Sequence, residues 1–325
     1  MLIILIFDMK LSIILTVYNK EPFLQRSLEA LFSQDQVNEG EYEVVAINDG
    51  STDGSQEFLQ SYAKKESRLR VYSQDNQGLS MARNNGIEKA LGDYVWFVDS
   101  DDVISSRSVR LICDTIDSKP DVIPIYAETK GDNYVRNKVP ITALSGKDVL
   151  LCKKWEHCGV FWIIRRNFLL EHCIFFMKGV FHEDSEFTPR MLYKAKHVSV
   201  IPTILYTVIH EPNSITSIPK PKRAFDCLEV ASSLYAFVSI NQDMGRTVRR
   251  VFYDTISMII NNSFSIIIQN PINEQSTFND EFKKKILLIH PLLKSRFKYR
   301  VEALLFSLFP GRYVQVYKCI SQVVL

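Results

Sequence analysis

The sequence predicts an α/β protein built on a mostly parallel sheet with helices on both faces, followed by a C-terminal helical region. Two observations lead to this prediction. Strand-like and helix-like patterns alternate from Lys10 to about Tyr126, and that alternation is typical of a parallel sheet covered by helices. Beyond about residue 222 only helical patterns remain.

The first strand and the first helix have clear local signals. Residues 11–17 form a nearly continuous apolar run rich in β-branched side chains, as expected of a parallel strand that is buried on both faces. Glu21 and Pro22 then open a helix, because proline fits the first turn. Apolar residues recur on one face of this helix as far as Phe32.

The next elements follow in the same order. A second strand is expected over residues 43–47, and the turn-forming cluster at 48–53 opens a helix. A short third strand at 69–72 precedes a helix over 78–91, which ends at a glycine. The fourth strand, at 94–98, runs directly into a cluster of aspartates. Polar groups therefore follow the strands at the edge where such sheets bind ligands.

The composition is that of an ordinary soluble globular protein. Of 325 residues, 46% are hydrophobic and 23% are charged, and the net charge is +2, which excludes disordered and fibrous classes. This charge gives no reason to expect nucleic acid as a partner. The six cysteines show no CxxC spacing, so a zinc ribbon is not expected, and they are typical of reduced thiols in a cytosolic protein.

The N-terminal residues 1–7 are strongly apolar. This run is too short to span a bilayer, and Asp8 and Lys10 follow it. It has neither a basic leader nor a small-residue cleavage site, so we do not expect a signal peptide. Met9 is an alternative start to Met1.

Two domains are expected. Residues 9–218 form the first, with a nucleotide-binding half at about 9–128 and an aromatic-rich half at about 145–216 for an acceptor. The Pro-Lys-Pro-Lys segment at 219–222 indicates a domain boundary. Residues 222–325 then form a helical region.

Three aspartates lie within four residues after the fourth strand. Asp99, Asp101 and Asp102 repel one another unless a positive charge neutralises them, and carboxylate oxygens suit Mg²⁺ or Mn²⁺. The alternative is that Asp102 only caps the following helix. The segment 78–86 opens a helix and carries Arg83 one turn in, so it could hold an anion. An arginine on the solvated face of a helix is the alternative.

Each of these blocks is common by itself, but their order and separations are specific. They are Thr16 to Glu21, Asn48 to Asp53, Gly78 to Gly86 and Asp99 to Asp102. Together they resemble glycosyltransferase family 2, the inverting nucleotide-sugar transferases with a GT-A fold, of the type that builds bacterial surface polysaccharides. The resemblance covers about residues 9–216.

The resemblance implies a role for each matching residue on the donor side. Thr16 stands where the family usually has proline, close to the nucleotide base. Tyr18 would pack against the base, and Glu21 would reach the ribose side. Asp49 matches the aspartate that accepts a hydrogen bond from uracil. Arg83 would contact the nucleotide or its diphosphate.

The resemblance also implies a metal site. Asp99 is expected near the ribose and the metal, and Asp101 on a Mn²⁺ or Mg²⁺ ion that bridges the diphosphate. Downstream, His210 lies close to the place where related transferases carry an arginine that closes over the diphosphate. His210 is therefore a candidate for phosphate or metal, with a structural loop histidine as the alternative.

An acidic pair at 183–184 follows the aromatic-rich segment. By itself it complements the positive end of a helix dipole. In the family the equivalent position supplies the general base, and Asp184 matches it. Glu183 would hold hydroxyl groups of the sugar.

The stretch from Lys283 to Lys318 is basic and amphipathic, with Glu302 as its one acid. This pattern favours an anionic membrane surface, and a helical cap with a solvated basic face is the alternative. Nucleic acid is not expected, because no recognition motif accompanies the charge.

The sequence thus predicts a metal-dependent glycosyltransferase that uses a UDP-sugar donor in cell-surface polysaccharide synthesis. Its acceptor is expected to be a glycan or a polyprenyl-diphosphate-linked glycan, and its location the cytoplasm, peripheral on the inner face of the cell membrane. A non-catalytic nucleotide-sugar binder is one alternative. A nucleotidyltransferase of similar topology is another, but it would need a Gly-rich basic loop after the first strand.

Overall fold

The computed structural model describes residues 9–38, 40–209 and 220–324. The chain divides into two compact units. The first holds Met1–Gly179 and Met191–Pro212, and the second holds Val180–Arg190 and Asn213–Leu325. Residues 180–190, which the sequence assigned to the acceptor half of the first domain, thus group with the C-terminal helices.

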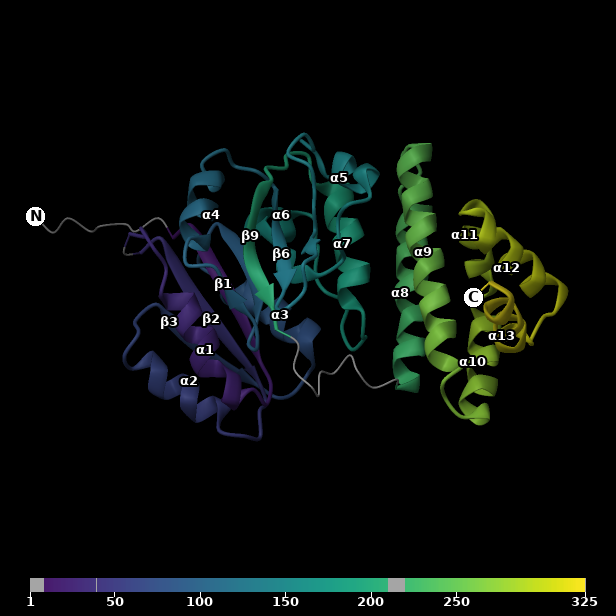
Figure 1. Cartoon of the computed structure of the whole chain (residues 1–325), viewed down its shortest axis with the longest axis horizontal. Coiled ribbons are helices and arrows are strands. Elements are labelled where there is room, and N and C mark those ends of the chain that lie inside the picture. The colour runs from purple at the N-terminus through teal and green to yellow at the C-terminus, as the bar shows by residue number, and fades with distance from the viewer. Residues whose placement is uncertain (1–8, 39, 210–219, 325) are drawn as a thin grey trace, which may run out of the picture. The chain divides into compact units, whose positions relative to one another are not determined.

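The first unit is organised around one sheet (Figure 1). Its first four strands are β1 (Leu11–Val17), β2 (Tyr42–Asp49), β3 (Leu69–Gln74) and β4 (Tyr94–Asp99). They lie in the order β3-β2-β1-β4 and all pair in parallel. Every residue of β1 and β2 is buried, which explains why the sequence of β1 shows a nearly continuous apolar run rather than alternation.

The other half of the sheet is mixed. It contains β5 (Val103–Ile104), β6 (Val122–Thr129), β7 (Val135–Arg136), β8 (Trp162–Arg165) and β9 (Ile201–Val208). Strand β8 runs antiparallel to both β4 and β6, whereas β6 and β9 are parallel. The predicted α/β class with a largely parallel sheet is confirmed. The strand direction of β8 carried no sequence signal, because a buried strand reads as apolar in either direction.

The helices of the first unit connect the strands of this sheet. They are α1 (Glu21–Phe32), α2 (Ser55–Ala63), α3 (Leu79–Lys89) and α4 (Ser108–Ile116), then α5 (Gly146–Cys152) and α6 (Arg166–Glu171). Helix α3 packs across β1 and β2. It comes close to β1 at Gly86, where a Cβ atom would lie 2.3 Å from Cγ2 of Ile14. Only glycine allows this approach.

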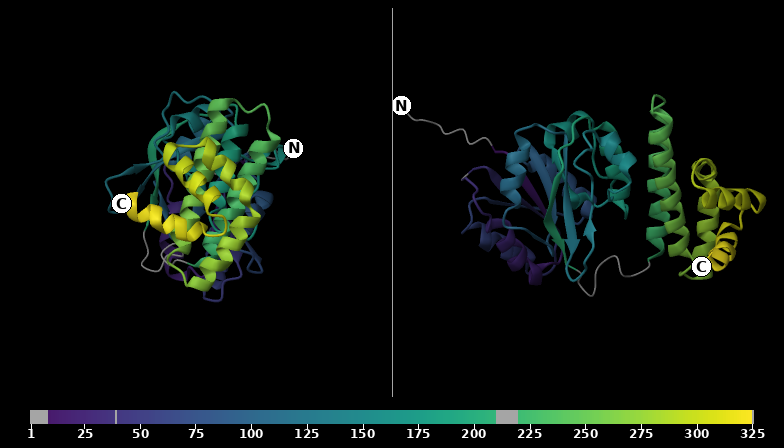
Figure 2. Two further views of the ribbon diagram at one scale, coloured as in Figure 1. Left: turned by 90° about the vertical axis from the view of Figure 1, so that its right-hand side faces the viewer. Right: turned by 45° about the horizontal axis from the view of Figure 1, so that its top comes forward.

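The second unit is helical. Helix α7 (Glu183–Lys194) begins in it and ends in the first unit. The other helices are α8 (Pro221–Ile240), α9 (Arg246–Ile267), α10 (Ile272–Lys284), α11 (Ile289–Lys294), α12 (Phe297–Leu308) and α13 (Tyr313–Val324). Helices α8 and α9 run side by side (Figures 1 and 2).

The core of this helical unit is aromatic. Phe264 of α9 contacts the rings of Phe278, Phe282, Phe306 and Tyr317, with centroids 5.1–5.2 Å apart. In the described residues, none of the helices combines the length and the apolar character needed to traverse a bilayer. The helical C-terminal region that the sequence predicts is present, as helices α8 to α13.

Candidate active site at the carboxyl ends of the strands

The strand register brings the predicted donor residues to one edge of the sheet. Thr16 of β1 lies opposite Ile47 of β2 and Asp99 of β4. The residues that follow these positions therefore leave the sheet at the same edge. Thr16 is buried, whereas Tyr18 is 44% exposed, so an aromatic residue is accessible there.

The loops after β1 and β2 are held together by hydrogen bonds. The Asn19 amide N–H donates to Ser51 Oγ at 3.0 Å, and the Thr52 N–H donates to Asn19 Oδ1 at 2.7 Å. Asn19 has a φ of 51°, a conformation that asparagine tolerates better than most residues. Glu21 Oε2 accepts from the Gly54 N–H at 3.1 Å. Hydrogen bonds thus join the loop after β1 to the loop after β2, and we call these two loops together the rim.

Asp49 is 3% exposed and ties the rim to α3. Its Oδ1 accepts from the Gln77 N–H at 2.8 Å and from Gln74 Nε2 at 2.7 Å. Its Oδ2 accepts from the Gly78 N–H at 2.8 Å. A carboxylate has about four acceptor positions. These three bonds leave room on Oδ2 for one further donor, such as the base proposed from the sequence.

Arg83 is nearly fully buried, with 1% exposure. Its Nη2 lies 3.2 Å from Asp99 Oδ1, and its guanidinium carbon lies 5.2 Å from the ring centroid of Phe176 and 5.9 Å from that of Phe97. The neighbouring Asn84 exchanges two hydrogen bonds of 2.9 Å with the Phe176 backbone. Arg83 thus lies beside Asp99 and fixes this carboxylate.

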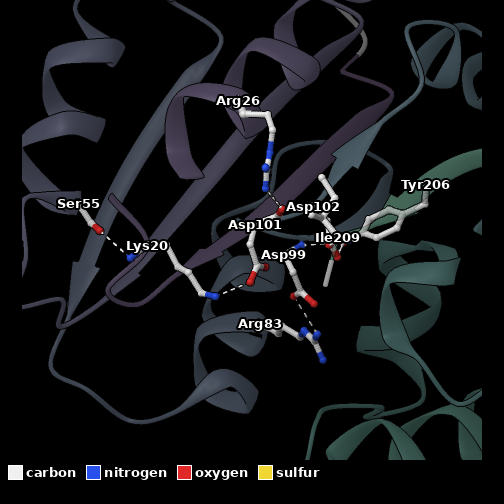
Figure 3. A network of polar contacts seen from close by, with 9 residues as sticks. All are labelled: Lys20, Arg26, Ser55, Arg83, Asp99, Asp101, Asp102, Tyr206 and Ile209. Carbon is white, nitrogen blue, oxygen red and sulfur yellow. Dashed lines mark hydrogen bonds and ion pairs between the residues drawn. The ribbon is translucent and has the colours of Figure 1, made fainter. Parts of the chain in front are cut away.

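Asp101 meets two cations of the chain (Figure 3). Lys20 Nζ forms an ion pair with Asp101 Oδ2. Arg26 Nη2 donates to the Asp101 carbonyl oxygen at 2.6 Å. Both side chains of the ion pair are partly exposed, Lys20 at 24% and Asp101 at 22%. This carboxylate can therefore be reached from solvent.

Asp102 points the other way, into the protein (Figure 3). Its Oδ2 accepts from the Tyr206 hydroxyl at 2.7 Å, and its Oδ1 accepts from the Ile209 N–H at 2.7 Å. Burial, together with the neighbouring Asp99 charge, raises the pKa of Asp102 to about 7, although the two hydrogen bonds act in the opposite direction. Its contacts within the protein make Asp102 a structural member of the cluster rather than a ligand for the donor.

Asp99 and Asp101 are the two aspartates that could hold a divalent cation together with phosphate oxygens of a donor. In the part of the chain that the structure describes, no three His, Cys, Asp or Glu side chains gather closely enough to form a complete metal site. Asp99 and Asp101 supply two carboxylates from one turn. Mg²⁺ is commonly held by one or two carboxylates together with substrate phosphates, so two such groups suffice when a diphosphate completes the oxygen set.

The predicted acceptor-side residues belong to the second unit. Glu183 and Asp184 open α7, and Glu183 is 8% exposed. His182, which precedes them, has a φ of 65°, and burial lowers its pKa. A cavity of about 240 Å³ lies beside this helix start and is lined by His182, Ser185, Cys227, Met258, Ile259 and Asn262.

The predicted donor residues have partners in the structure that the sequence did not indicate. The structure brings Tyr18, Asp49, Asp99 and Asp101 to one edge of the sheet, whereas His210 lies outside the described residues. The partners that the sequence did not indicate are Lys20, Arg26 and Tyr206. Lys20 is 81 residues from Asp101 in the chain, so no local pattern connected the two. Tyr206 lies on a distant strand, and the sequence alone did not connect it with the aspartates.

Comparisons with known proteins agree on one family. Residues 12–173 match the family described as "Glycosyl transferase family 2". The chain is 32% identical over 221 residues to the uncharacterized glycosyltransferase EpsJ of Bacillus subtilis, over 64% of this chain and 63% of EpsJ. It is 29% identical over 228 residues to the cholesterol galactosyltransferase of Borreliella burgdorferi, over 64% of this chain and 62% of that protein. The matches thus span less than two thirds of these relatives.

Solved structures share the fold. The chain resembles Staphylococcus aureus TarS 1-349 in complex with UDP-GlcNAc, with a TM-score of 0.76 and 22% identity, over 97% of this chain and 91% of that chain. It also resembles the mannosyltransferase PcManGT from Pyrobaculum calidifontis in complex with GDP-Man and Mn²⁺, with a TM-score of 0.51 and 14% identity, over 95% of this chain and 86% of that chain. At these identities the likeness is one of fold.

Proposed function

The chain belongs to glycosyltransferase family 2 and has the GT-A fold, and on this premise we propose that it is an inverting, metal-dependent glycosyltransferase. Its donor is a UDP-sugar, and its acceptor is a hydroxyl group of a glycan or of a polyprenyl-diphosphate-linked glycan. The reaction belongs to cell-surface polysaccharide synthesis.

One observation carries this proposal. An exposed aromatic ring, a buried carboxylate with one acceptor position to spare, and two reachable carboxylates stand at the carboxyl edge of a parallel sheet. They are Tyr18, Asp49, Asp99 and Asp101. This set offers stacking for a base, a hydrogen-bond acceptor for a uracil N–H and oxygen ligands for a cation near a diphosphate. The TarS complexes with UDP-GlcNAc and UDP support a uridine donor.

The chemistry proposed for the site is a single displacement. The acceptor oxygen forms a bond to the anomeric carbon while the bond from that carbon to the diphosphate oxygen breaks. The diphosphate leaves with the bonding electron pair, and the acceptor proton passes to the Asp184 carboxylate. Glu183, beside it at the start of α7, would bind hydroxyl groups of the sugar.

The donor side has to stabilise a leaving diphosphate. A bound Mn²⁺ or Mg²⁺ supplies positive charge for that purpose, and Asp99 and Asp101 are the residues that would hold it. Arg83 keeps Asp99 in place through their contact of 3.2 Å. Because Arg83 is buried, it acts on the donor through Asp99 rather than as a solvent-facing phosphate clamp.

The direct test is binding and turnover of donors by the purified chain. Calorimetry with UDP in the presence of Mn²⁺ should give saturable binding, and GDP under the same conditions should bind more weakly. A panel of nucleotide-sugars should then identify the one that is slowly hydrolysed in the absence of acceptor. Lack of binding of both nucleotides would contradict the proposed donor site.

We also propose that the second unit docks on an anionic membrane surface. Four apolar side chains form a stripe along one face of α12, which we call the α12 stripe: Phe297, Val301, Leu304 and Leu308. All four are exposed, from 36% at Val301 to 80% at Phe297. The basic residues Lys294, Arg296, Lys298 and Arg300 are exposed nearby.

The acidic side chains close to the α12 stripe are largely buried and do not cancel the exposed basic charge. Glu302 is 4% exposed and accepts from Asn261 Nδ2 at 2.6 Å. Asp254 pairs with Arg296 at 3.5 Å, but its side chain is only 11% exposed, so the exposed charge around the α12 stripe is mainly basic. Apolar side chains flanked by basic ones suit the interface of an anionic bilayer. Peripheral attachment to the inner face of the cell membrane would place the enzyme where lipid-linked acceptors are found.

A further inference from the structure

Lys20 occupies a special position between the first strand and the first helix. Its backbone N–H donates to Ser55 Oγ at 3.0 Å, so the residue is fixed at its base. Its ammonium group reaches Asp101 and lies 5.3 Å from the ring centroid of Phe23. The Arg26 guanidinium carbon lies 5.8 Å from the same ring. Two cations of α1 and its N-terminal flank are thus directed at one residue of the aspartate turn.

Cationic side chains contact the aspartate turn at several points. Asp99, Asp101 and Asp102 carry the acidic groups, and Arg83, Lys20 and Arg26 provide three cationic partners to the turn (Figure 3). The turn therefore holds its aspartates together before any ligand arrives. A divalent cation added to this arrangement would meet positive charge at the carboxylate it needs.

Lys20 is the cation of the three that can leave. Arg83 is enclosed, with 1% exposure. Arg26 contacts the Asp101 carbonyl rather than the carboxylate. Lys20 is partly exposed, and its ammonium group sits at the end of a flexible four-carbon stem. A modest rotation of that stem would release the Asp101 carboxylate and carry the charge to a neighbouring anion.

We propose that Lys20 is an internal counter-ion that occupies Asp101 in the free protein, and that it moves to the nucleoside diphosphate when the diphosphate binds with a divalent cation. This inference rests on the donor site proposed above. It makes binding of the cation and the diphosphate cooperative, because the diphosphate removes the competitor of the cation. The cation alone binds weakly, since it has to displace an ammonium group that then has no anion to go to.

The experiment measures Mn²⁺ affinity without UDP and with saturating UDP, by calorimetry or by the spectrum of free Mn²⁺. Lys20→Met removes the charge, and Lys20→Arg retains it. Lys10→Met is the matched control, because Lys10 also pairs with a carboxylate, Glu41, at 3.3 Å and has a similar exposure of 27%. Lys10 precedes β1 at the opposite end from Lys20.

For the wild type and for Lys10→Met we expect weak Mn²⁺ binding that UDP strengthens. For Lys20→Met we expect Mn²⁺ alone to bind roughly tenfold more tightly, because a charge in contact with a carboxylate changes its affinity for cations by about that factor. The strengthening by UDP should shrink correspondingly, and by linkage Mn²⁺ should strengthen UDP binding less. Lys20→Arg should keep the wild-type coupling.

Two results would overturn the inference and are distinguishable from failure of the donor site. Unchanged or weaker binding of Mn²⁺ alone to Lys20→Met, in a protein that still binds UDP, would refute the counter-ion role only. Lack of UDP binding by the wild type at any Mn²⁺ concentration would refute the donor site itself, and the counter-ion role with it.

Discussion

Tyr206 and Asp102, 104 residues apart in the chain, are joined by a hydrogen bond of 2.7 Å from the tyrosine hydroxyl to the carboxylate. The same hydroxyl accepts from the Asp99 backbone N–H at 3.1 Å. Tyr206 lies on β9, whereas Asp99 ends β4 and Asp102 follows it, so one phenol joins the two halves of the sheet. The backbone of the proposed metal-binding turn is thereby fixed from behind.

We expect Tyr206→Phe to lower the free energy of unfolding by about 1–3 kcal/mol, because Asp102 loses a buried partner. It should also weaken binding of UDP with Mn²⁺, since the turn loses its support. Tyr94→Phe is the control: Tyr94 is also buried and donates to the Pro120 carbonyl at 2.6 Å, away from the strand-end site. Urea unfolding should show a lower free energy of unfolding for both variants. Calorimetry should show weaker binding of UDP with Mn²⁺ only for Tyr206→Phe. Equal UDP affinity in the two variants would refute the supporting role.

Asp101→Ala should weaken UDP binding in Mn²⁺ by about tenfold or more, because one of two proposed carboxylate ligands is lost. Binding of UDP without metal should change much less. Calorimetric titrations with Mn²⁺ and with a chelator separate the two effects. The metal assignment fails if the wild type binds UDP equally well in both conditions.

Asp184→Asn keeps the shape of the side chain but cannot accept a proton. We expect transfer to the acceptor to fall by roughly 10²-fold or more while donor binding survives. The measurement is the rate of transfer together with UDP affinity. Near wild-type transfer would exclude Asp184 as the base, and Glu183→Gln would then be the next variant to test.

Burial lowers the pKa of His157 from 6.5 to about 4. The unfolded chain therefore takes up this proton near pH 6.5, and the folded protein only near pH 4. Between these values the unfolded state binds more protons, so the free energy of unfolding falls as the pH falls. From pH 7 to pH 5 the wild type should lose up to about 2 kcal/mol more than His157→Gln.

Urea unfolding at pH 5 and pH 7 measures this difference. His197→Gln is the control, because His197 is exposed and lies in the same unit. The burial argument is wrong if His157→Gln and the wild type lose equal stability over this range.

The double variant Phe297→Ser with Leu308→Ser removes two members of the α12 stripe, which are 80% and 70% exposed. We expect it to bind anionic vesicles several-fold less than the wild type at low salt, because less apolar area enters the interface. Ile240→Ser with Ile272→Ser is the matched control, since these residues are 80% and 81% exposed in the same unit. Co-sedimentation at low and high salt measures the binding.

Two outcomes would contradict membrane docking through the α12 stripe. One is a wild-type protein that does not bind anionic vesicles at low salt. The other is equal loss of binding in the stripe variant and in the matched control. Either result would leave this surface as the solvated face of a helical cap.

The sequence was most informative where local rules decide the structure. The first strand was predicted at residues 11–17 and is observed at Leu11–Val17, because a buried parallel strand has an unbroken apolar signature. The helix start at Glu21 followed from Pro22. The two-residue strand β5 was missed, since it is too short to show any periodicity.

Long-range partners could not be predicted in the same way. Lys20 and Asp101 are 81 residues apart, and Tyr206 and Asp99 are 107 residues apart. No periodic pattern connects such residues, because they meet only after the sheet has assembled. The role of Asp99 and Asp101 as metal ligands therefore stays a prediction from the sequence, whereas the groups that contact them were visible only in the folded chain.

The close approach at Gly86 has a consequence for tolerance to mutation. Gly86 lies one turn after Arg83 on α3, and any side chain there would collide with Ile14 of β1. Relief of that collision would lift the helix and carry the Arg83 guanidinium away from Asp99. A saturation screen that scores only glycosyl transfer would then rank position 86 among the catalytic positions, although Gly86 offers no side chain to any substrate.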